Sequence, residues 1–520
     1  MHLRFIQDDA FISFCYARNL VEGEGLTWFG ARVEGYTNFL WVLWIALGIL
    51  VGVDPTAWAQ GGGIASFLVV ILTTWLLARR VFREPLLAGV AVLLLVTNYT
   101  TISYATGGME TMAQTALICA AMWQVYELWA TTRPSRLRLS ALSTLLALAI
   151  LARPDSLLPG AILGTVACVD LIRKRSHWGR YAALALPLLL LVGPWVSWKL
   201  IYYGRVLPNT YYVKVPGGFN PNGVVHAWRF VHWYLFWPIL LIGIPVRLFV
   251  PSVPRFCLWP LWCVISAWTL YVVSIGGDFM EFRMFVPIAP FLFICLAYLI
   301  YLPVSLLRLR AGVPAAAMLL LLLVGASYHH ATTFEGTTED DALDSIESLS
   351  TFYGLYADGN WDMVGGTLRR EMGGTDAIIG LFAVGAIPFY SGLTTVDMYG
   401  LNDREIPFEG DKLDLESRRP GHRVQAKLSD LRERGVNLVI GHPRLVQRNL
   451  LRQPGSAALC RRFVRSMVSA KTKGIGDALV VSMPVTGRFG LLMWYLTPHP
   501  QVEERIRGGQ WEARRVRVDR

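Results

Sequence analysis

Residues 180–201, RYAALALPLLLLVGPWVSWKLI, carry charge only near their two ends, at Arg180 and Lys199. A helix of about 20 apolar residues is long enough to cross the hydrocarbon core of a bilayer. Similar apolar runs recur near 36–53, 61–78, 85–104, 110–130, 137–152, 156–173, 232–250, 256–275, 283–301 and 312–328. The sequence therefore predicts an α-helical polytopic membrane protein with about 11 spans.

The composition agrees with this fold class. Of the 520 residues, 54% are hydrophobic and 16% are charged, whereas about a quarter of a soluble domain is charged. A soluble enzyme and a disordered chain are excluded. The net charge of +11 arises from basic residues that often stand in short clusters between apolar runs, a pattern of orientation signals and lipid contacts that argues against a nucleic-acid partner.

The seven cysteines follow no spacing motif. Five of them lie in apolar runs, where cysteine behaves as a small buried hydrophobe. Only Cys15 and Cys460 lie outside these runs. The sequence therefore predicts neither a disulfide framework nor a metal cluster built on cysteine.

The character of the sequence changes after about residue 330. The segment 331–375 is polar and acidic, and the later apolar patches Asp376–Ala386 and Val436–Ile440 have the length of strands. We expect three parts: a first exported loop with an amphipathic helix (1–35), a transmembrane domain (36–329) and a soluble exported α/β domain (330–520).

Short basic clusters predict the orientation of the spans. These clusters contain Arg79, Arg80 and Arg83; Arg133, Arg136 and Arg138; Arg173, Lys174, Arg175 and Arg180; Arg247 and Arg255; and Arg308 and Arg310. If all five are cytoplasmic, the spans from 85 to 328 alternate without conflict. The loops at 104–110, 153–155, 202–231 and 276–283 and the C-terminal domain then share the exported face.

The same count places residues 1–35 in the cytoplasm, opposite the other polar motifs. Either one of the runs 36–53 and 61–78 is a broken or half-crossing helix, or the Arg79 cluster is an exception to the charge rule. Both alternatives remain open at this point. If residues 1–35 are exported, we expect a further transmembrane helix upstream of Met1.

Two adjacent acids, Asp8 and Asp9, open a predicted short amphipathic helix at 8–20. Acidic side chains at a helix N-terminus interact favourably with the helix dipole, which would by itself explain why Asp8 and Asp9 stand there. The alternative is a general base or a cation site, because neighbouring carboxylates shift each other's pKa. The spacing does not decide between the two.

Four further motifs place polar groups at the predicted membrane boundary, where ionisable groups are costly unless they face a wet cavity or a bound charge. Their residues are Glu34, Tyr36 and Asn38; Glu110; Asn209, Tyr211, Tyr212 and Lys214; and Asp278, Glu281 and Arg283. Structural alternatives are an aromatic belt for Tyr36, helix capping for Glu110 and for Asp155, and an ion pair of Arg283 with Asp278 or Glu281.

The C-terminal domain adds Tyr390, in a segment 385–392 that we interpret as a strand end entering a loop with a turn at Ser391-Gly392, and His422. The sequence contains no nucleotide fingerprint, P-loop or zinc motif. The energy for any reaction must therefore arrive with the substrate.

In their order and shared face, these motifs resemble those of the GT-C superfamily of glycosyltransferases, most closely the branch of terminal arabinofuranosyltransferases of actinobacterial cell walls. The resemblance extends from the N-terminal segment to the C-terminal domain. It is carried by Asp8 to Trp41, Gly107-Gly108-Met109-Glu110-Thr111, Arg153-Pro154-Asp155, Pro208-Asn209-Thr210-Tyr211-Tyr212, Gly277 to Arg283, Ile387 to Gly392 and Gly400-Leu401-Asn402-Asp403.

The resemblance implies a multi-pass enzyme of the bacterial plasma membrane whose active site faces the exported side. Its donor would be a polyprenyl-phosphate-linked sugar and its acceptor an envelope glycan or glycolipid. Asp8 or Asp9 would be the catalytic base, and Arg18, Lys214 and Arg283 would hold the lipid phosphate. Donor or acceptor contacts would come from Glu34, Tyr36, Asn38, Glu110, Asn209, Tyr211, Tyr212, Asp278, Tyr390 and His422.

The resemblance implies no required cofactor and is compatible with a divalent cation, Mg²⁺ or Mn²⁺, bound by Asp8 and Asp9. Cys15 stands where the family pattern has arginine, which removes one expected phosphate contact. Two other classes of function remain open. A transporter or lipid-linked glycan flippase would suit the many spans, although the sequence shows no internal repeat, and a non-catalytic scaffold would need the acids only as helix caps.

Overall fold

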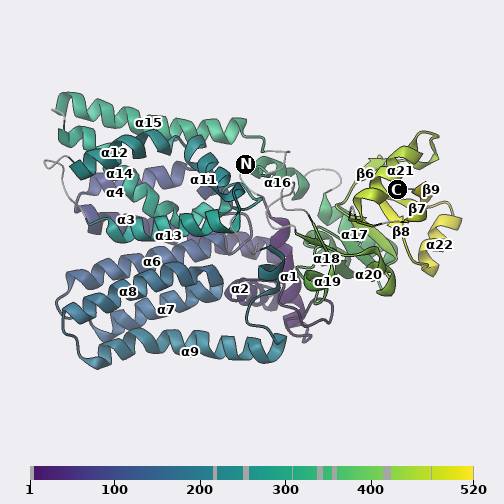
Figure 1. Ribbon diagram of the computed structural model, residues 1–520, viewed down its shortest axis with the longest axis horizontal. Helices are drawn as coiled ribbons and strands as arrows, with labels where there is room; N and C mark the ends of the chain where they lie inside the picture. Colours follow the sequence, from purple (N-terminus) through teal and green to yellow (C-terminus); the bar gives the residue numbers. More distant parts are fainter. Residues whose placement is uncertain are drawn as a thin grey trace.

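The computed structural model describes residues 5–214, 220–249, 257–306, 309–336, 343–353, 360–413, 423–469, 471–472 and 474–518. Figure 1 shows two parts, an elongated bundle of helices and a smaller C-terminal part that contains the strands. Helix α1 (Asp8–Val21) lies between them. His422, one of the candidate site residues, lies outside the described residues.

The apolar runs of the sequence form the helices of the bundle, often ending within a few residues of the predicted limits. They are α2 (Phe39–Leu50), α3 (Pro55–Phe82), α4 (Pro85–Thr97), α5 (Tyr99–Tyr104), α6 (Thr111–Ala130), α7 (Arg136–Ala152), η1 (Pro154–Ser156), α8 (Leu157–Arg173), α9 (Trp178–Tyr203), α10 (Asn209–Lys214), α11 (Asn222–Trp233), α12 (Phe236–Phe249), α13 (Trp259–Ile275), η2 (Arg283–Ile288), α14 (Ala289–Leu306) and α15 (Leu309–Thr333).

Among the described residues, five helical segments are long and apolar enough to cross a membrane, and the pair α11 and α12, bent by 91°, makes a sixth if it is one span. They differ in their surroundings. The 18-residue window in Arg283–Leu306 is 94% buried inside the protein, whereas that in α9 is 6% buried. Helix α14 is therefore central, and α9, at the edge of the bundle in Figure 1, presents its apolar side chains to lipid.

Helix α2 (Phe39–Leu50) bears by its length on the orientation upstream of residue 79. It has 12 residues and is about 18 Å long, which is short of the roughly 30 Å of a hydrocarbon core. The Trp58 indole at the start of α3 donates a hydrogen bond of 2.8 Å to the Trp44 carbonyl, and the two rings stack at 4.7 Å. Helix α2 is therefore too short to cross a bilayer by itself, which favours the half-crossing alternative for the run 36–53.

The C-terminal part is an α/β domain built on a mixed sheet. Strands β2 (Thr394–Asp397), β1 (Ile378–Leu381) and β5 (Leu438–Gly441) are parallel, and β8 (Phe489–Tyr495) pairs antiparallel with β5. The sheet order is β2-β1-β5-β8-β7-β9, with β6 on β8, and β3 pairs with β4. The remaining strands are β3 (Asp411–Lys412), β4 (Val424–Gln425), β6 (Leu445–Gln447), β7 (Gly476–Pro484) and β9 (Glu512–Val518).

The C-terminal part also contains short helices (Figure 1). They are α16 (Ile346–Tyr353), α17 (Trp361–Met372), α18 (Ala386–Ser391), α19 (Ile406–Glu409), α20 (Leu428–Glu433), η4 (Leu450–Arg452), α21 (Ser456–Ser466) and α22 (Pro500–Arg507). The segment 385–392, interpreted as a loop and turn, is instead helix α18, and Gly392 at φ +68° ends it. The domain limits at 35/36 and 329/330 stay predictions; α15 continues to Thr333.

Helix α1 joins the two parts of the molecule. Ten of its 14 side chains are buried and the other four are half-buried, so it is a bridge between two protein surfaces and not a helix with one face in lipid. Phe11 packs against Phe389 and Tyr390 of α18 with ring centroids 5.6 and 5.5 Å apart. Arg18 Nη1 donates 2.8 Å to the Phe389 carbonyl. The N-terminal segment and the C-terminal domain thus lie on the same face of the bundle.

Candidate functional site

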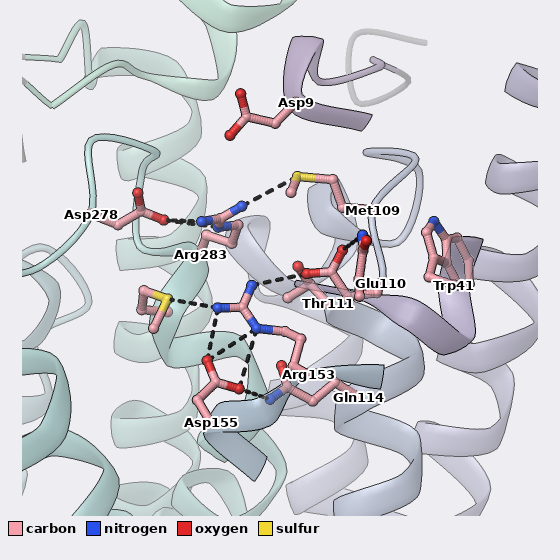
Figure 2. Close-up of polar contacts among 12 residues, drawn as sticks. Asp9, Trp41, Met109, Glu110, Thr111, Gln114, Arg153, Asp155, Asp278 and Arg283 are labelled. Atoms are coloured by element: carbon pink, nitrogen blue, oxygen red, sulfur yellow. Dashed lines mark hydrogen bonds and ion pairs between the residues drawn. The ribbon is translucent and has the colours of Figure 1, made fainter. Parts of the chain in front are cut away.

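The polar motifs of the sequence meet between this face of the bundle and the C-terminal domain. Figure 2 shows the carboxylates and guanidinium groups that α1, α6, the loop before α8 and the segment before α14 bring together. The loops predicted to share one face therefore do so. The site has an upper layer of Asp9, Asp278 and Arg283, and a lower layer around Arg153.

Asp8 faces the C-terminal domain. Its carboxylate accepts hydrogen bonds from the backbone N–H groups of Gly385, at 3.1 Å, and Ala386, at 2.7 Å, where α18 begins. Burial raises the pKa of Asp8 to about 7, against the opposing effect of these backbone donors, and the neighbouring Asp9 raises it further. Both carboxylate oxygens therefore have protein partners 377 and 378 residues away in sequence.

Asp9 has a different environment. Its side chain is 24% exposed, and its Oδ2 lies 3.9 Å from the Nζ atom of Lys214, which is itself 29% exposed. Adjacent residues on a helix point about 100° apart, so Asp9 faces the bundle when Asp8 faces the domain. Figure 2 places the Asp9 carboxylate above the Arg283 guanidinium. Asp9 is thus an accessible carboxylate beside a cation.

Asp278 and Arg283 form a buried ion pair. Arg283 Nε and Nη2 donate to Asp278 Oδ2 at 2.8 and 2.7 Å. Burial works against ionisation of Asp278, but the positive charges of Arg283 and Lys214 hold its pKa below the ordinary value. The third nitrogen, Arg283 Nη1, contacts only the Met109 sulfur at 3.3 Å among the described residues. A thioether is a weak acceptor, so this nitrogen keeps donor capacity for an anion.

The lower layer was only partly predicted. Glu110 accepts from Asn38 Nδ2 at 2.6 Å and from Arg153 Nη1 at 2.9 Å. Arg153 Nε and Nη2 donate to Asp155 at 3.0 and 2.8 Å, and Gln114 Nε2 donates to the same carboxylate at 2.7 Å. Glu110 and Asp155 are therefore fixed by a network, not by the helix capping considered above. No sequence signal identified Gln114.

Three other candidates hold the protein together. Glu34 pairs with Lys199 at 2.7 Å, and both side chains are buried. Tyr36 is buried with its hydroxyl 3.1 Å from that of Tyr203. Asn209 Nδ2 donates to the carbonyls of Gly400, Leu401 and Asp403 at 2.8, 3.1 and 2.6 Å. Each thereby connects segments that are distant in sequence.

The remaining candidates lie near the junction of the two parts. Arg18 donates a hydrogen bond to the Phe389 carbonyl and lies over that ring. Tyr390 packs on Phe11. Tyr211 is exposed, and Tyr212 packs against Phe408 with centroids 5.2 Å apart. Of these, Tyr211 is free to meet a ligand.

A divalent cation shared by Asp8 and Asp9 does not fit this arrangement. Both oxygens of Asp8 accept backbone N–H groups, and the Asp9 carboxylate lies beside the ammonium of Lys214. A hard cation such as Mg²⁺ needs several free oxygen ligands around it. The carboxylate pair is therefore a poor cation site.

Sequence comparison finds two similarities. Residues 356–478 match a domain of unknown function (DUF8728). The terminal β-(1→2)-arabinofuranosyltransferase of Mycobacterium tuberculosis is 26% identical over 270 residues, an alignment that covers 48% of this chain and 42% of that protein. The matched region thus spans less than half the length of this relative.

Structure comparison finds similarity along almost the whole chain. ArnT from Cupriavidus metallidurans bound to undecaprenyl phosphate superposes with a TM-score of 0.55 at 13% identity, covering 94% of both chains. The oligosaccharyltransferase of Archaeoglobus fulgidus superposes with a TM-score of 0.52 at 11% identity, covering 94% of this chain and 71% of that one. These superpositions confirm the predicted GT-C-like fold, with a C-terminal strand-containing domain.

Proposed function

We propose that the protein is a membrane glycosyltransferase of the bacterial plasma membrane. It moves a sugar from a polyprenyl-phosphate donor to a hydroxyl group of an envelope glycan or glycolipid on the exported face. The donor class is supported by the fold shared with an enzyme bound to undecaprenyl phosphate, and an arabinofuranosyl donor by the similarity to the arabinofuranosyltransferase.

The observation that carries the proposal is that the charged side chains of the upper layer are not fully paired with one another. Arg283 keeps one nitrogen against a sulfur, Lys214 is partly exposed, and Asp9 is an accessible carboxylate beside both cations. Two cations and one base at a membrane boundary match what transfer from a lipid phosphate requires.

In the proposed reaction, a hydroxyl oxygen of the acceptor forms a bond to C1 of the donor sugar. The bond between C1 and the phosphate oxygen breaks, and its electron pair stays on the phosphate. Asp9 accepts the proton of the hydroxyl group. Lys214 and Arg283 stabilise the second negative charge that develops on the polyprenyl phosphate. No metal enters this sequence of steps.

The other candidates receive supporting roles. Asp278 orients Arg283, and Asp8 fixes α1 against the C-terminal domain, so we assign the base to Asp9 and not to Asp8. Tyr211, exposed on the same short helix as Lys214, is placed to stack on a sugar. Arg18 belongs to the interface with α18 and not to the phosphate site.

The experiment is transfer in proteoliposomes with a panel of polyprenyl-phosphate sugars and envelope extracts as acceptors. One donor should turn over, and Asp9→Asn should reduce its turnover by about 10²- to 10⁴-fold. Glu22→Gln, at the exposed end of the same helix, is the matched control and should retain full turnover. Failure of every donor, together with translocation of a lipid-linked sugar, would instead establish the flippase.

A further inference from the structure

Three arginines gather around a small cavity on the same face of the bundle, at the end of α9. The cavity has a volume of about 20 Å³ and is lined by Arg32, Val33, Glu34, Tyr203, Arg205, Leu207, Asn209 and Arg404. Two of its arginines, Arg32 and Arg404, are exposed, and Arg205 is half-buried. The site residues discussed above contribute only Glu34 and Asn209 to it.

The cavity has a net positive lining. Glu34 is already neutralised by Lys199, with 2.7 Å between the charged atoms. In the described part of the chain, none of Arg32, Arg205 and Arg404 has a carboxylate within 4 Å. Three arginines thus line a space whose carboxylate among the described residues, Glu34, is already paired with Lys199.

Arg205, which lines the cavity, has one guanidinium nitrogen that makes no hydrogen bond with the described residues. Its guanidinium lies 4.0 Å from the centre of the Phe408 ring, and its Nη2 donates 3.5 Å to the Arg404 carbonyl. Its Nη1 is buried and has no hydrogen-bond partner among the described residues. A buried charged donor without an acceptor costs free energy, which a bound anion would recover. A volume of about 20 Å³ accommodates one oxygen atom, since a water needs roughly 10–15 Å³.

The surroundings of the cavity are apolar and exposed. Ile201 and Val206, on either side of the end of α9, are 87% and 64% exposed in the protein alone. Exposed side chains of this kind at the end of a lipid-facing helix lie at the level of acyl chains and headgroups.

We propose that Arg32, Arg205 and Arg404 bind the phosphate headgroup of an anionic membrane lipid, with one headgroup oxygen in the cavity and the acyl chains along the end of α9. This site is separate from Lys214 and Arg283. Asn209 in its wall begins α10, the short helix that ends with Lys214, so an occupied site also steadies the position of Lys214. The inference rests on the cavity and its charges and does not depend on the proposed activity.

The test uses the full-length protein in neutral detergent and follows its melting temperature during titration with phosphatidylglycerol, phosphatidylcholine or inorganic phosphate. A ligand that binds the folded state raises the melting temperature in a concentration-dependent way. Phosphatidylglycerol should raise it at the lowest concentration. Equal shifts with phosphatidylcholine, or the same shift with inorganic phosphate alone, would overturn the proposal.

The variant that removes Arg32, Arg205 and Arg404 together, each replaced by Gln, should bind phosphatidylglycerol about 100-fold more weakly, since each basic residue near an anionic surface contributes about fivefold. The control replaces the exposed Arg444, Arg448 and Arg462 of the C-terminal domain by Gln, with the same change of net charge, and should stay within twofold of the wild type.

Single variants keep the test decisive if the triple variant does not fold. Arg32→Gln removes an exposed side chain whose described contact is with the Tyr202 ring at 4.9 Å, and Arg404→Gln also changes an exposed side chain. Each should weaken phosphatidylglycerol binding about fivefold. Unchanged affinity in both would overturn the proposal, as would a shift seen with polyprenyl phosphate and absent with phosphatidylglycerol.

Discussion

Arg283 and Arg153 lie in successive layers of the same site, yet their hydrogen bonds differ. Every nitrogen of the Arg153 guanidinium has a carboxylate partner, Glu110 or Asp155. Arg283 gives two nitrogens to Asp278 and directs the third at a sulfur. A saturated network fixes structure, and an unsaturated one can bind a substrate (Figure 2). The lower layer therefore supports the upper layer, where we place the chemistry.

The largest effect should come from breaking the lower layer. Arg153→Met leaves Glu110 and Asp155 as buried carboxylates without their cation, which should destabilise the protein by about 3–5 kcal/mol. Denaturant or thermal unfolding in detergent measures this loss. Arg138→Met is the control, because its carboxylate partner is 3.9 Å away and the side chain is 47% exposed, and it should change stability by less than about 1 kcal/mol. Equal stability of the two variants would contradict a supporting role for Arg153.

A substitution in the upper layer should lower kcat and leave the stability of the protein unchanged. Lys214→Met should lower kcat by about 10²- to 10³-fold, because a donor to the developing phosphate charge is lost, while the melting temperature stays unchanged. Steady-state transfer assays and thermal unfolding measure the two quantities. Lys174→Met, which breaks an ion pair with Asp170 at the other end of the bundle, should retain full kcat. A stable protein with normal kcat for Lys214→Met would remove Lys214 from the phosphate site.

The two adjacent acids allow a test by pH. The pKa of Asp8 rises from 3.8 to about 7 on folding, mainly through burial, so the folded chain binds this proton more tightly than the unfolded chain. The contribution of Asp8 to stability is therefore complete below about pH 4 and declines as the pH rises to about 7. Asp8→Asn should remove this decline and, by leaving one backbone N–H without an acceptor, cost about 1–3 kcal/mol at low pH.

The measurement is the difference in melting temperature between the wild type and Asp8→Asn from pH 4 to pH 8. Glu34, Glu281 and Asp397 also have raised pKa values, so the difference between the two proteins isolates Asp8. A difference that stays constant across this range would mean that Asp8 is ionised at all these pH values.

The smallest effect should come from the hydrogen bond by which Trp41 of α2 holds the loop that precedes Glu110. Trp41 Nε1 donates 3.0 Å to the Gly108 carbonyl, which holds the loop that precedes Glu110. Trp41→Phe keeps most of the packing and removes the donor, so it should destabilise the protein by about 1 kcal/mol with little change in kcat. Thermal unfolding and the transfer assay check the two parts. A loss of kcat beyond about tenfold would show that the lower layer also controls the reaction.

The sequence predicted the class of fold because hydrophobic periodicity and length are local properties. The apolar runs, the basic clusters and the change of composition after residue 330 identified the membrane part and the α/β domain. The helix α2 is shorter than the run 36–53, which is apolar enough for a span, because Asp54 and Pro55 start α3 soon after its 12 residues. Where the chain turns within such an apolar segment depends on tertiary packing, such as that of Trp44 on Trp58, which the sequence alone does not reveal.

The sequence identified several of the residues that meet at this face of the bundle, but it did not reveal how their roles are divided. Asp8 and Asp9 are equivalent in the sequence, and they differ because the partners of Asp8, Gly385 and Ala386, come from the far end of the chain. Asn209 looked like a ligand contact and binds backbone carbonyls of the C-terminal domain for the same reason. Contacts over hundreds of residues leave no local pattern, and a single sequence does not reveal them.

The central claim, that Asp9 is the base and Asp8 the structural partner of α18, is tested most directly by measuring kcat and melting temperature of Asp8→Asn and Asp9→Asn side by side, with the donor that the panel identifies. We expect Asp9→Asn to keep the wild-type melting temperature and lose about 10²- to 10⁴-fold in kcat, and Asp8→Asn to melt lower when unfolding is followed at about pH 4 and to keep kcat within about tenfold. Loss of kcat in Asp8→Asn at an unchanged melting temperature, with turnover retained by Asp9→Asn, would contradict the account.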